Sequence, residues 1–145
     1  MKKGSGFNSV VIFIIVAFVL FKVVAPKFIN KTGDNIGIYT ALTELENAID
    51  EFRKYYLKNG NFTTINIMTY VTGFENSSQK LEFNKPIKYG VLGSDGVMNY
   101  CTELTITNNN GEFMELKPIN SRSEICRTFV DEQRFQNLRK TPLKF

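Results

Sequence analysis

The sequence of 145 residues contains no histidine, no tryptophan and only two cysteines. Without histidine the chain lacks the usual general base of enzymes and the most common metal ligand. Two cysteines without histidine supply too few soft ligands for a zinc site. We therefore expect no catalytic residues, no cofactor and no metal site.

The chain also lacks a strong charge of either sign. The 18 lysines and arginines against 14 acidic residues give a net charge of +4, and the basic residues are scattered. A basic patch for nucleic acid is therefore only weakly indicated. The length is typical of one domain.

Acidic residues are absent before Asp34, and this region contains the most apolar stretch of the chain. Every residue from Val10 to Phe21 is apolar, Lys22 interrupts the run, and three more apolar residues lead to Pro26. A lysine in such a helix costs a few kcal/mol at the bilayer centre, and less if its ammonium reaches the interface. Lys22 is either a simple boundary residue or a residue that limits the chain to a few copies, or to the tip, of any assembly built from such helices.

The apolar run has three ordinary interpretations. A cleaved secretory signal would end in a small-residue exit site, but Pro26-Lys27-Phe28 follows the run. A buried core helix is disfavoured because both faces of the stretch are apolar and a chain of this length offers little core around it. In a signal anchor, Lys2 and Lys3 would hold the N-terminus in the cytoplasm, and the chain after Pro26 would lie outside.

The residues that flank the run resemble those of a known family. Lys2-Lys3-Gly4-Ser5-Gly6-Phe7 resembles the short basic leader of type IV pilins and type II secretion pseudopilins. In that family a prepilin peptidase cuts after a glycine, and a phenylalanine usually becomes the first mature residue. The continuation Pro26–Asp34 looks like pilins related to the mannose-sensitive haemagglutinin pilus, and Tyr55–Thr64 looks like the end of the family's long helix.

This resemblance covers residues 1–64 well and the remainder loosely. It implies a leader peptide over 1–6 that is cleaved between Gly6 and Phe7, an apolar transmembrane or filament-core helix over 7–31, and a periplasmic head over 32–145. The implied fold is α+β and pilin-like, with a long N-terminal helix, transmembrane in its first half, packed on a small antiparallel sheet. The implied partners are other pilin subunits, prepilin peptidase, the inner-membrane pilus assembly machinery and the lipid bilayer. The implied location is the inner membrane, and after assembly a periplasmic or extracellular filament.

One departure from the family pattern bears on the kind of subunit. Family members usually carry glutamate at the fifth mature position, where it offsets the free amine of a neighbouring subunit in the apolar filament core. Cleavage after Gly6 places Val11 there, and cleavage after Gly4 places Ser9 there. Members without this glutamate tend to be minor subunits, so a minor pilin is favoured. An unprocessed leader remains open, as does an anchored periplasmic binding protein that does not polymerise.

Residues 38–56 have the clearest helical periodicity. Apolar residues recur at spacings of four and three, which places them on one stripe, and a Lys-Asn-Gly ending supplies the stop. Gly33 and Gly37 either break the helix or weaken it by about 1 kcal/mol each, and Pro26 should kink it. We expect one long, bent helix from about residue 8 to about residue 58. The stripe consists of Ile38, Leu42, Leu45, Ile49, Phe52 and Tyr56.

The remaining chain predicts a small sheet and a second helix. Residues 61–85 form a linking loop, tucked down by Ile65, Ile67, Met68, Tyr70 and Val71. The Asn-rich sequence at 108–111 is a strong hairpin signal. We expect a helix that starts at Ser121–Glu124, followed by a frayed basic tail from Arg134 to Phe145. The three expected antiparallel strands are Pro86–Leu92, Tyr100–Thr107, in which Cys101 and Thr102 face opposite sides, and Phe113–Ile119.

The two cysteines are Cys101, on a predicted strand, and Cys126, on the helix that follows the sheet. Outside the cytoplasm disulfides persist, so the predicted topology favours a bond between them over two reduced, buried thiols. The bridge would contribute on the order of 3 kcal/mol by the loop-entropy model.

Charged and polar motifs elsewhere have ordinary explanations. Glu44 with Glu51, and Asp50 with Arg53, are most simply solvated charges on a helix face. Asn76-Ser77-Ser78 fits a glycosylation acceptor pattern, but such matches are frequent by chance.

Overall fold

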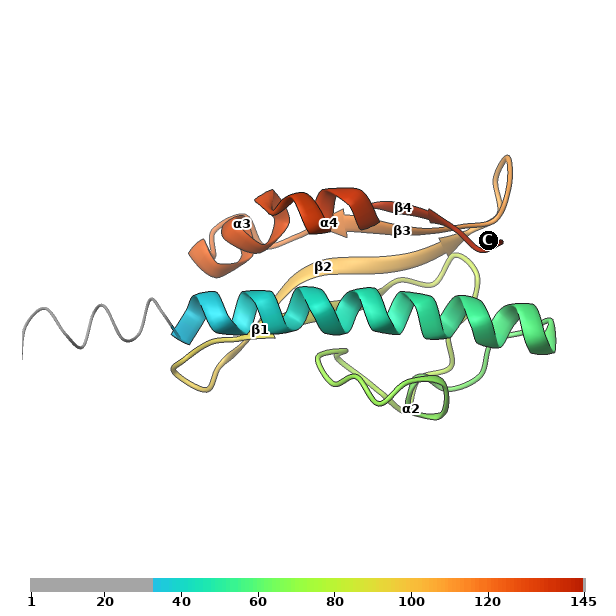
Figure 1. The fold of residues 1–145 in the computed structure, drawn as a ribbon, viewed down its shortest axis with the longest axis horizontal. Helices are drawn as coiled ribbons and strands as arrows, with labels where there is room; N and C mark the ends of the chain where they lie inside the picture. The colour runs from blue at the N-terminus through green and yellow to red at the C-terminus, as the bar shows by residue number, and fades with distance from the viewer. Residues whose placement is uncertain (1–32, 145) are drawn as a thin grey trace, which may run out of the picture.

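The computed structural model describes residues 33–144. In Figure 1 a long helix, residues 33–59, lies across one face of a four-stranded antiparallel sheet. This confirms the α+β class and the packing of a long helix on a small antiparallel sheet. The predicted leader, the apolar segment 7–31 and the predicted kink lie outside the described residues. Within 33–144, no helix has both the length and the apolar character needed to cross a membrane.

The long helix buries the stripe that the periodicity predicted. Five of its six residues are buried, Tyr56 is half-buried, and Ala41 and Ala48 widen the stripe. The helix ends one residue beyond the predicted stop. Gly60 follows with φ of 74° and donates its N–H to the carbonyl of Tyr56 at 2.7 Å, which satisfies a terminal carbonyl.

Gly37 does not break the helix, and Gly33 is its first described residue. A Cβ atom at Gly37 would lie 2.7 Å from the carbonyl oxygen of Leu92, which is closer than a carbon atom can approach. The missing side chain therefore lets the helix touch the end of the first strand. This contact explains a glycine that helix propensity alone would disfavour.

The sheet is a meander in the order β1-β2-β3-β4, each strand antiparallel to its neighbour. The first three strands match the predicted ones to within two residues. The Asn-rich turn closes the hairpin between Thr107 and Phe113, with Asn110 and Gly111 at positive φ. The strands are β1 Ile87–Leu92, β2 Met98–Thr107, β3 Phe113–Pro118 and β4 Lys140–Pro142.

One irregularity interrupts the pairing of β1 with β2. Tyr89 pairs with Thr102 and Gly90 pairs with Tyr100, so Cys101 has no partner in the ladder. Cys101 and Thr102 are both completely buried. The predicted strict alternation, which placed these two residues on opposite faces, is therefore wrong at this point. An extra residue in one strand breaks the period-two pattern.

The predicted frayed tail is also wrong, and so is the count of three strands. After α3, Glu124–Asp131, the chain forms a second short helix, α4, Gln133–Leu138, and then β4. Phe135 and Leu143 are completely buried and anchor this segment. In Figure 1, α3 and α4 lie alongside the long helix. Two isolated apolar anchors among charged residues produce no periodicity that could reveal the structure.

The connection between the long helix and β1 is only partly as predicted. It contains the short helix α2, Ile65–Met68, whose two terminal residues are buried. Val71 is half-buried, but Ile67 is 68% exposed and Tyr70 is 99% exposed. The side chains of these last two residues therefore do not anchor the loop to the core. Phe62, Phe74 and Leu81 serve that role instead.

Candidate functional site

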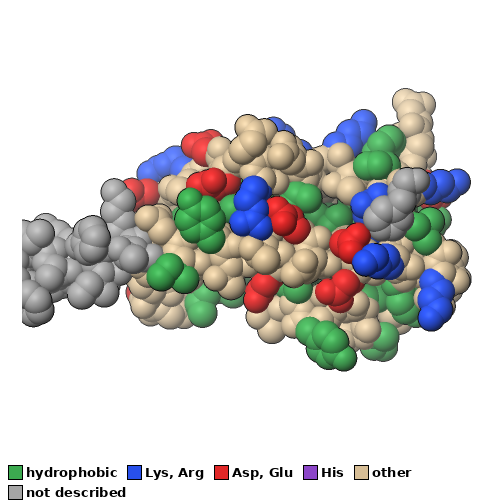
Figure 2. Space-filling view, viewed as in Figure 1, with side chains coloured by type: hydrophobic (Ala, Val, Ile, Leu, Met, Phe, Trp, Pro, Cys, Tyr) green, Lys and Arg blue, Asp and Glu red, His purple; other side chains and the backbone are tan. Residues whose placement is uncertain are grey.

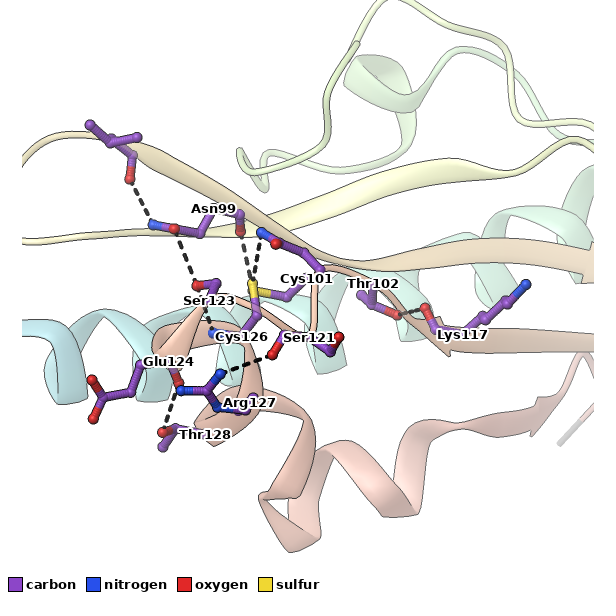
Figure 3. Close-up of a disulfide and its surroundings, with 12 residues drawn as sticks. Asn99, Cys101, Thr102, Lys117, Ser121, Ser123, Glu124, Cys126, Arg127 and Thr128 are labelled. Atoms are coloured by element: carbon purple, nitrogen blue, oxygen red, sulfur yellow. Dashed lines mark hydrogen bonds between the residues drawn. A yellow bond between two sulfur atoms is a disulfide. The ribbon is translucent and has the colours of Figure 1, made fainter.

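Cys101 and Cys126 form a disulfide, which confirms the predicted pairing (Figure 3). Their Cα atoms are 4.8 Å apart, and the bond closes a sequence separation of 25 residues. Both residues are at most 1% exposed. The bond ties α3, which lies between β3 and β4 in sequence, to β2 inside the sheet.

Hydrogen bonds at the start of α3 join the same two elements. Ser123 is the N-cap residue: its Oγ accepts the N–H of Cys126 at 3.2 Å and donates to Oδ1 of Asn99 at 3.3 Å. Asn99 lies on β2, two residues before Cys101 (Figure 3). The cap fixes the orientation of α3, so Cys126 is presented to its partner by local structure as well as by the bond.

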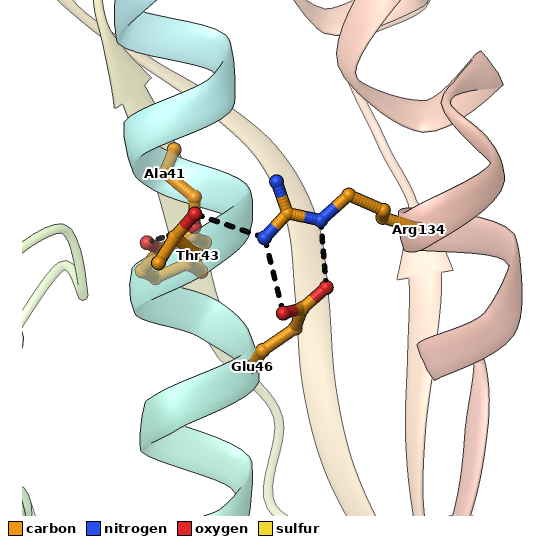
Figure 4. Close-up of polar contacts among 5 residues, drawn as sticks. Ala41, Thr43, Glu46 and Arg134 are labelled. Carbon is orange, nitrogen blue, oxygen red and sulfur yellow. Dashed lines mark hydrogen bonds and ion pairs between the residues drawn. The ribbon is translucent and has the colours of Figure 1, made fainter.

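The C-terminal segment is also held to the long helix by a charged contact (Figure 4). Arg134 on α4 donates to both carboxylate oxygens of Glu46, at 2.9 and 3.0 Å, and to the hydroxyl of Thr43 at 2.9 Å. Two parallel bonds to one carboxylate fix direction as well as distance. The hydrogen bond to Glu46 raises the pKa of Arg134. Sequence reasoning missed this contact because it joins residues 88 positions apart.

Tyr89 connects the middle of β1 to the long helix. Its hydroxyl donates to the carbonyl of Ala41 at 2.7 Å, and the side chain is completely buried. Burial raises the pKa of Tyr89 well above its ordinary value of 10.0, because the ionised form would lose its hydration. The first half of the helix is therefore held by the close approach at Gly37 and the hydrogen bond from Tyr89, and its middle is held by Arg134 through Glu46.

The most exposed positions on the outward face of the long helix between residues 36 and 47 are uncharged, whereas Glu44 and Glu46 are half-buried there. Tan and green atoms dominate this part of Figure 2, and charged side chains flank it and become more frequent toward the far end of the helix. Ile36 is 62% exposed and Tyr39 is 53% exposed. The exposed positions from 36 to 47 are Ile36, Tyr39, Thr40, Thr43 and Asn47.

Two further apolar side chains are exposed at the same end of the domain. Leu92 and Val97, at 55% and 57% exposure, flank the turn between β1 and β2. The N–H of Ser94 in this turn donates to Oδ1 of Asp34 at 2.9 Å, which holds the turn beside the first turn of the described helix. We define Ile36, Tyr39, Leu92 and Val97 as the proximal apolar surface. It lies where the chain before residue 33 joins the domain.

The remaining candidate residues make local contacts. Asp50 pairs with Lys54 at 2.8 Å, and both side chains are exposed, as expected for solvated helix charges. Oδ1 of Asn76 accepts the N–H of Ser78 at 3.0 Å, so this motif forms a local turn. In the part of the chain that the structure describes, no three His, Cys, Asp or Glu side chains are grouped to hold a metal ion. The predicted cleavage residues Gly6 and Phe7 lie outside that part.

No family model, curated protein or solved structure matches this chain. Its function is therefore inferred from its own residues and their geometry.

Proposed function

We propose that the chain is a pilin-like structural subunit, and more specifically a minor pilin. It would be inserted in the inner membrane through residues 7–31 and assembled through its N-terminal helix into a type IV pilus or a type II secretion pseudopilus. The observation that carries the proposal is an order of features along the chain. A basic leader-like sequence and an apolar run precede a long helix on an antiparallel meander, and the disulfide bonds α3 to β2 of that meander.

Assembly of such a subunit follows from the cost of exposing apolar surface to water. The apolar run is stored in the bilayer and then moves sideways into a bundle of similar helices, so that its surface stays out of water throughout. Beyond that run, a neighbour must pack against the outward face of the long helix. Residues 36–47 offer about 18 Å of helix whose most exposed side chains are uncharged. The half-exposed Glu46 is paired with Arg134, and the half-exposed Glu44 must keep its contact with water when a neighbour packs there.

The disulfide supports the proposed location of the domain. Disulfides persist in the periplasm and outside the cell but are rare in the cytoplasm. The bond between Cys101 and Cys126 is buried and joins two elements that the predicted topology places outside. Its presence agrees with an N-terminus held in the cytoplasm by Lys2 and Lys3.

Val11 or Ser9 in place of the usual glutamate favours a minor subunit, and it also leaves an alternative. An anchored periplasmic binding protein would have the same anchor and disulfide but would not polymerise. The two functions differ in processing and in sedimentation with filaments.

The test is to produce the chain in a pilus-bearing host with and without its prepilin peptidase, and to probe sheared filaments with an antibody to the domain. We expect the chain in the sheared fraction only when the peptidase is present. A Gly6→Ala variant and a matched Gly4→Ala variant should identify the cleaved bond. A chain that stays in the membrane fraction of both hosts would favour the binding protein.

A further inference from the structure

A shallow groove runs between the start of the long helix and α3. It encloses about 190 Å³. The buried Ile38 and the half-buried Ile125 form its apolar lining. One carboxylate comes from each wall, Asp34 from the long helix and Glu124 from the first turn of α3. The lining residues are Asp34, Asn35, Ile38, Glu124, Ile125 and Thr128.

The carboxylates of this groove have no cationic partner among residues 33–144. The ion pairs within this range join other residues. Asp34 accepts one backbone N–H from Ser94 through Oδ1, which leaves Oδ2 to a further donor. Glu124 lies in the first turn of α3, where a negative charge is favoured by the helix dipole. The groove therefore presents negative charge beside an apolar lining.

The chain before the described domain has the complementary charge. The first 33 positions contain five lysines and no acidic residue. Two of these lysines, Lys27 and Lys31, lie between the apolar run and the domain, in the segment Pro26–Lys31. A lysine side chain combines an apolar stem with a charged head, so it can lie along apolar surface while its ammonium contacts carboxylates.

We propose that this groove binds the Pro26–Lys31 segment of a second copy of the chain. The stem of Lys27 or Lys31 lies over Ile38 and Ile125, and its ammonium contacts Asp34 and Glu124. This inference rests on the proposed assembly into filaments and requires that two copies of the chain be neighbours there. When the apolar run leaves the bilayer for a bundle of helices, the lysines that follow it lose part of their water on the side facing the bundle. A buried or half-buried ammonium without an opposite charge is strongly disfavoured, and the groove supplies that charge.

The direct test is zero-length carbodiimide crosslinking, which joins an ammonium to a carboxylate only when the two are in contact. Filaments are assembled from an equal mixture of ¹⁴N-labelled and ¹⁵N-labelled mature chains, crosslinked, and digested for mass spectrometry. We expect peptides that join Lys27 or Lys31 of one label to Asp34 or Glu124 of the other. Crosslinks found only within one label would show that Lys31 contacts its own chain, and they would overturn the proposal.

Variants test the same contact without a chemical reagent. Glu124→Gln keeps the shape of the groove and removes its charge, and Asp131→Asn is a matched control on the same helix, where the side chain is also exposed. We expect Glu124→Gln to lower the amount of chain in filaments severalfold and Asp131→Asn to leave it unchanged. Glu124→Lys should abolish incorporation, and adding Lys27→Glu or Lys31→Glu should restore it.

Folding of the domain and incorporation of the chain into filaments are measured separately. Formation of the disulfide in each variant, measured by free-thiol labelling of the unfolded chain, reports that the domain has folded. Filaments that contain the chain but show no mixed-label crosslink, and that tolerate Glu124→Lys, would overturn this inference and leave the proposed function standing. Failure of the unaltered chain to enter filaments would overturn both.

Discussion

Removal of the disulfide should destabilise the domain strongly, and the size of the effect follows from the chain length it closes. A bond across 25 residues removes about 12 cal/mol/K of chain entropy from the unfolded state, which is about 3.5 kcal/mol at 25 °C. Because small domains are stable by only about 5–15 kcal/mol, this is a large share. The sulfur atoms are also buried, so their loss leaves space in the core.

The perturbation is the double variant Cys101→Ala/Cys126→Ala of the full-length chain in detergent. Its free energy of unfolding is compared with that of the unaltered, oxidised chain in urea, followed by circular dichroism. We expect a loss of about 3–4 kcal/mol, with a fall in melting temperature on the order of 10–20 °C. Ser123→Ala is a useful companion, because it removes the N-cap of α3 while the bond remains, and it should cost about 1 kcal/mol.

A loss below about 1 kcal/mol in the double variant would refute the loop-entropy reasoning. It would show that the hydrogen bonds of Ser123 with Asn99 and Cys126, together with the packing of Phe129, hold α3 in place without the bond. Free-thiol labelling of the unfolded, unreduced parent chain is the control. Two labelled thiols there would rule out the disulfide itself.

Three further perturbations test other contacts. Gly37→Ala should lower the melting temperature although alanine is the better helix former, because its Cβ would collide with a carbonyl of β1. Asn35→Ala, at an exposed position of the same helix, should leave the melting temperature unchanged. Equal melting temperatures for Gly37→Ala and the unaltered chain would contradict the close approach. Tyr89→Phe should cost about 1 kcal/mol at pH 7. Burial raises the pKa of Tyr89 above 10.0, so its phenol is neutral in the folded and unfolded states below pH 10. Above pH 10 the phenol ionises first in the unfolded chain, so the free energy of unfolding should fall as pH rises beyond 10. Tyr89→Phe should make that fall shallower in urea titrations, and identical pH slopes for the two chains would contradict the assignment. Lys22→Leu should raise the copy number of the chain in filaments, measured by quantitative immunoblotting, if Lys22 limits assembly; unchanged incorporation of a stable variant would show that Lys22 is only a boundary residue.

The sequence predicted those parts of the fold that repeat locally. The stripe from Ile38 to Tyr56 has a clear helical period, and the Asn-rich turn at 108–111 marks a hairpin. The pairing of Cys101 with Cys126 followed from the predicted topology. The helical period and the hairpin turn depend on residues that are close in sequence, so they can be predicted without a structure.

The parts that were missed depend on contacts between distant residues. β4 is held by pairing with β3 and by Phe135 and Leu143, and no periodicity marks such isolated anchors. The bond between Arg134 and Glu46 spans 88 positions. The proximal apolar surface and the groove at Asp34 and Glu124 arise only when the start of the long helix meets β1 and α3. Single apolar or acidic residues in the sequence do not indicate contacts between elements that are distant in sequence.

The mass of the mature chain tests the central proposal most directly. The full-length chain is produced with and without prepilin peptidase, purified from membranes, and its intact mass and N-terminal peptide are determined. If the chain is a pilin-like subunit, the peptidase should remove residues 1–6 and leave Phe7 as the first residue. The same uncleaved mass with and without active peptidase would contradict the proposal.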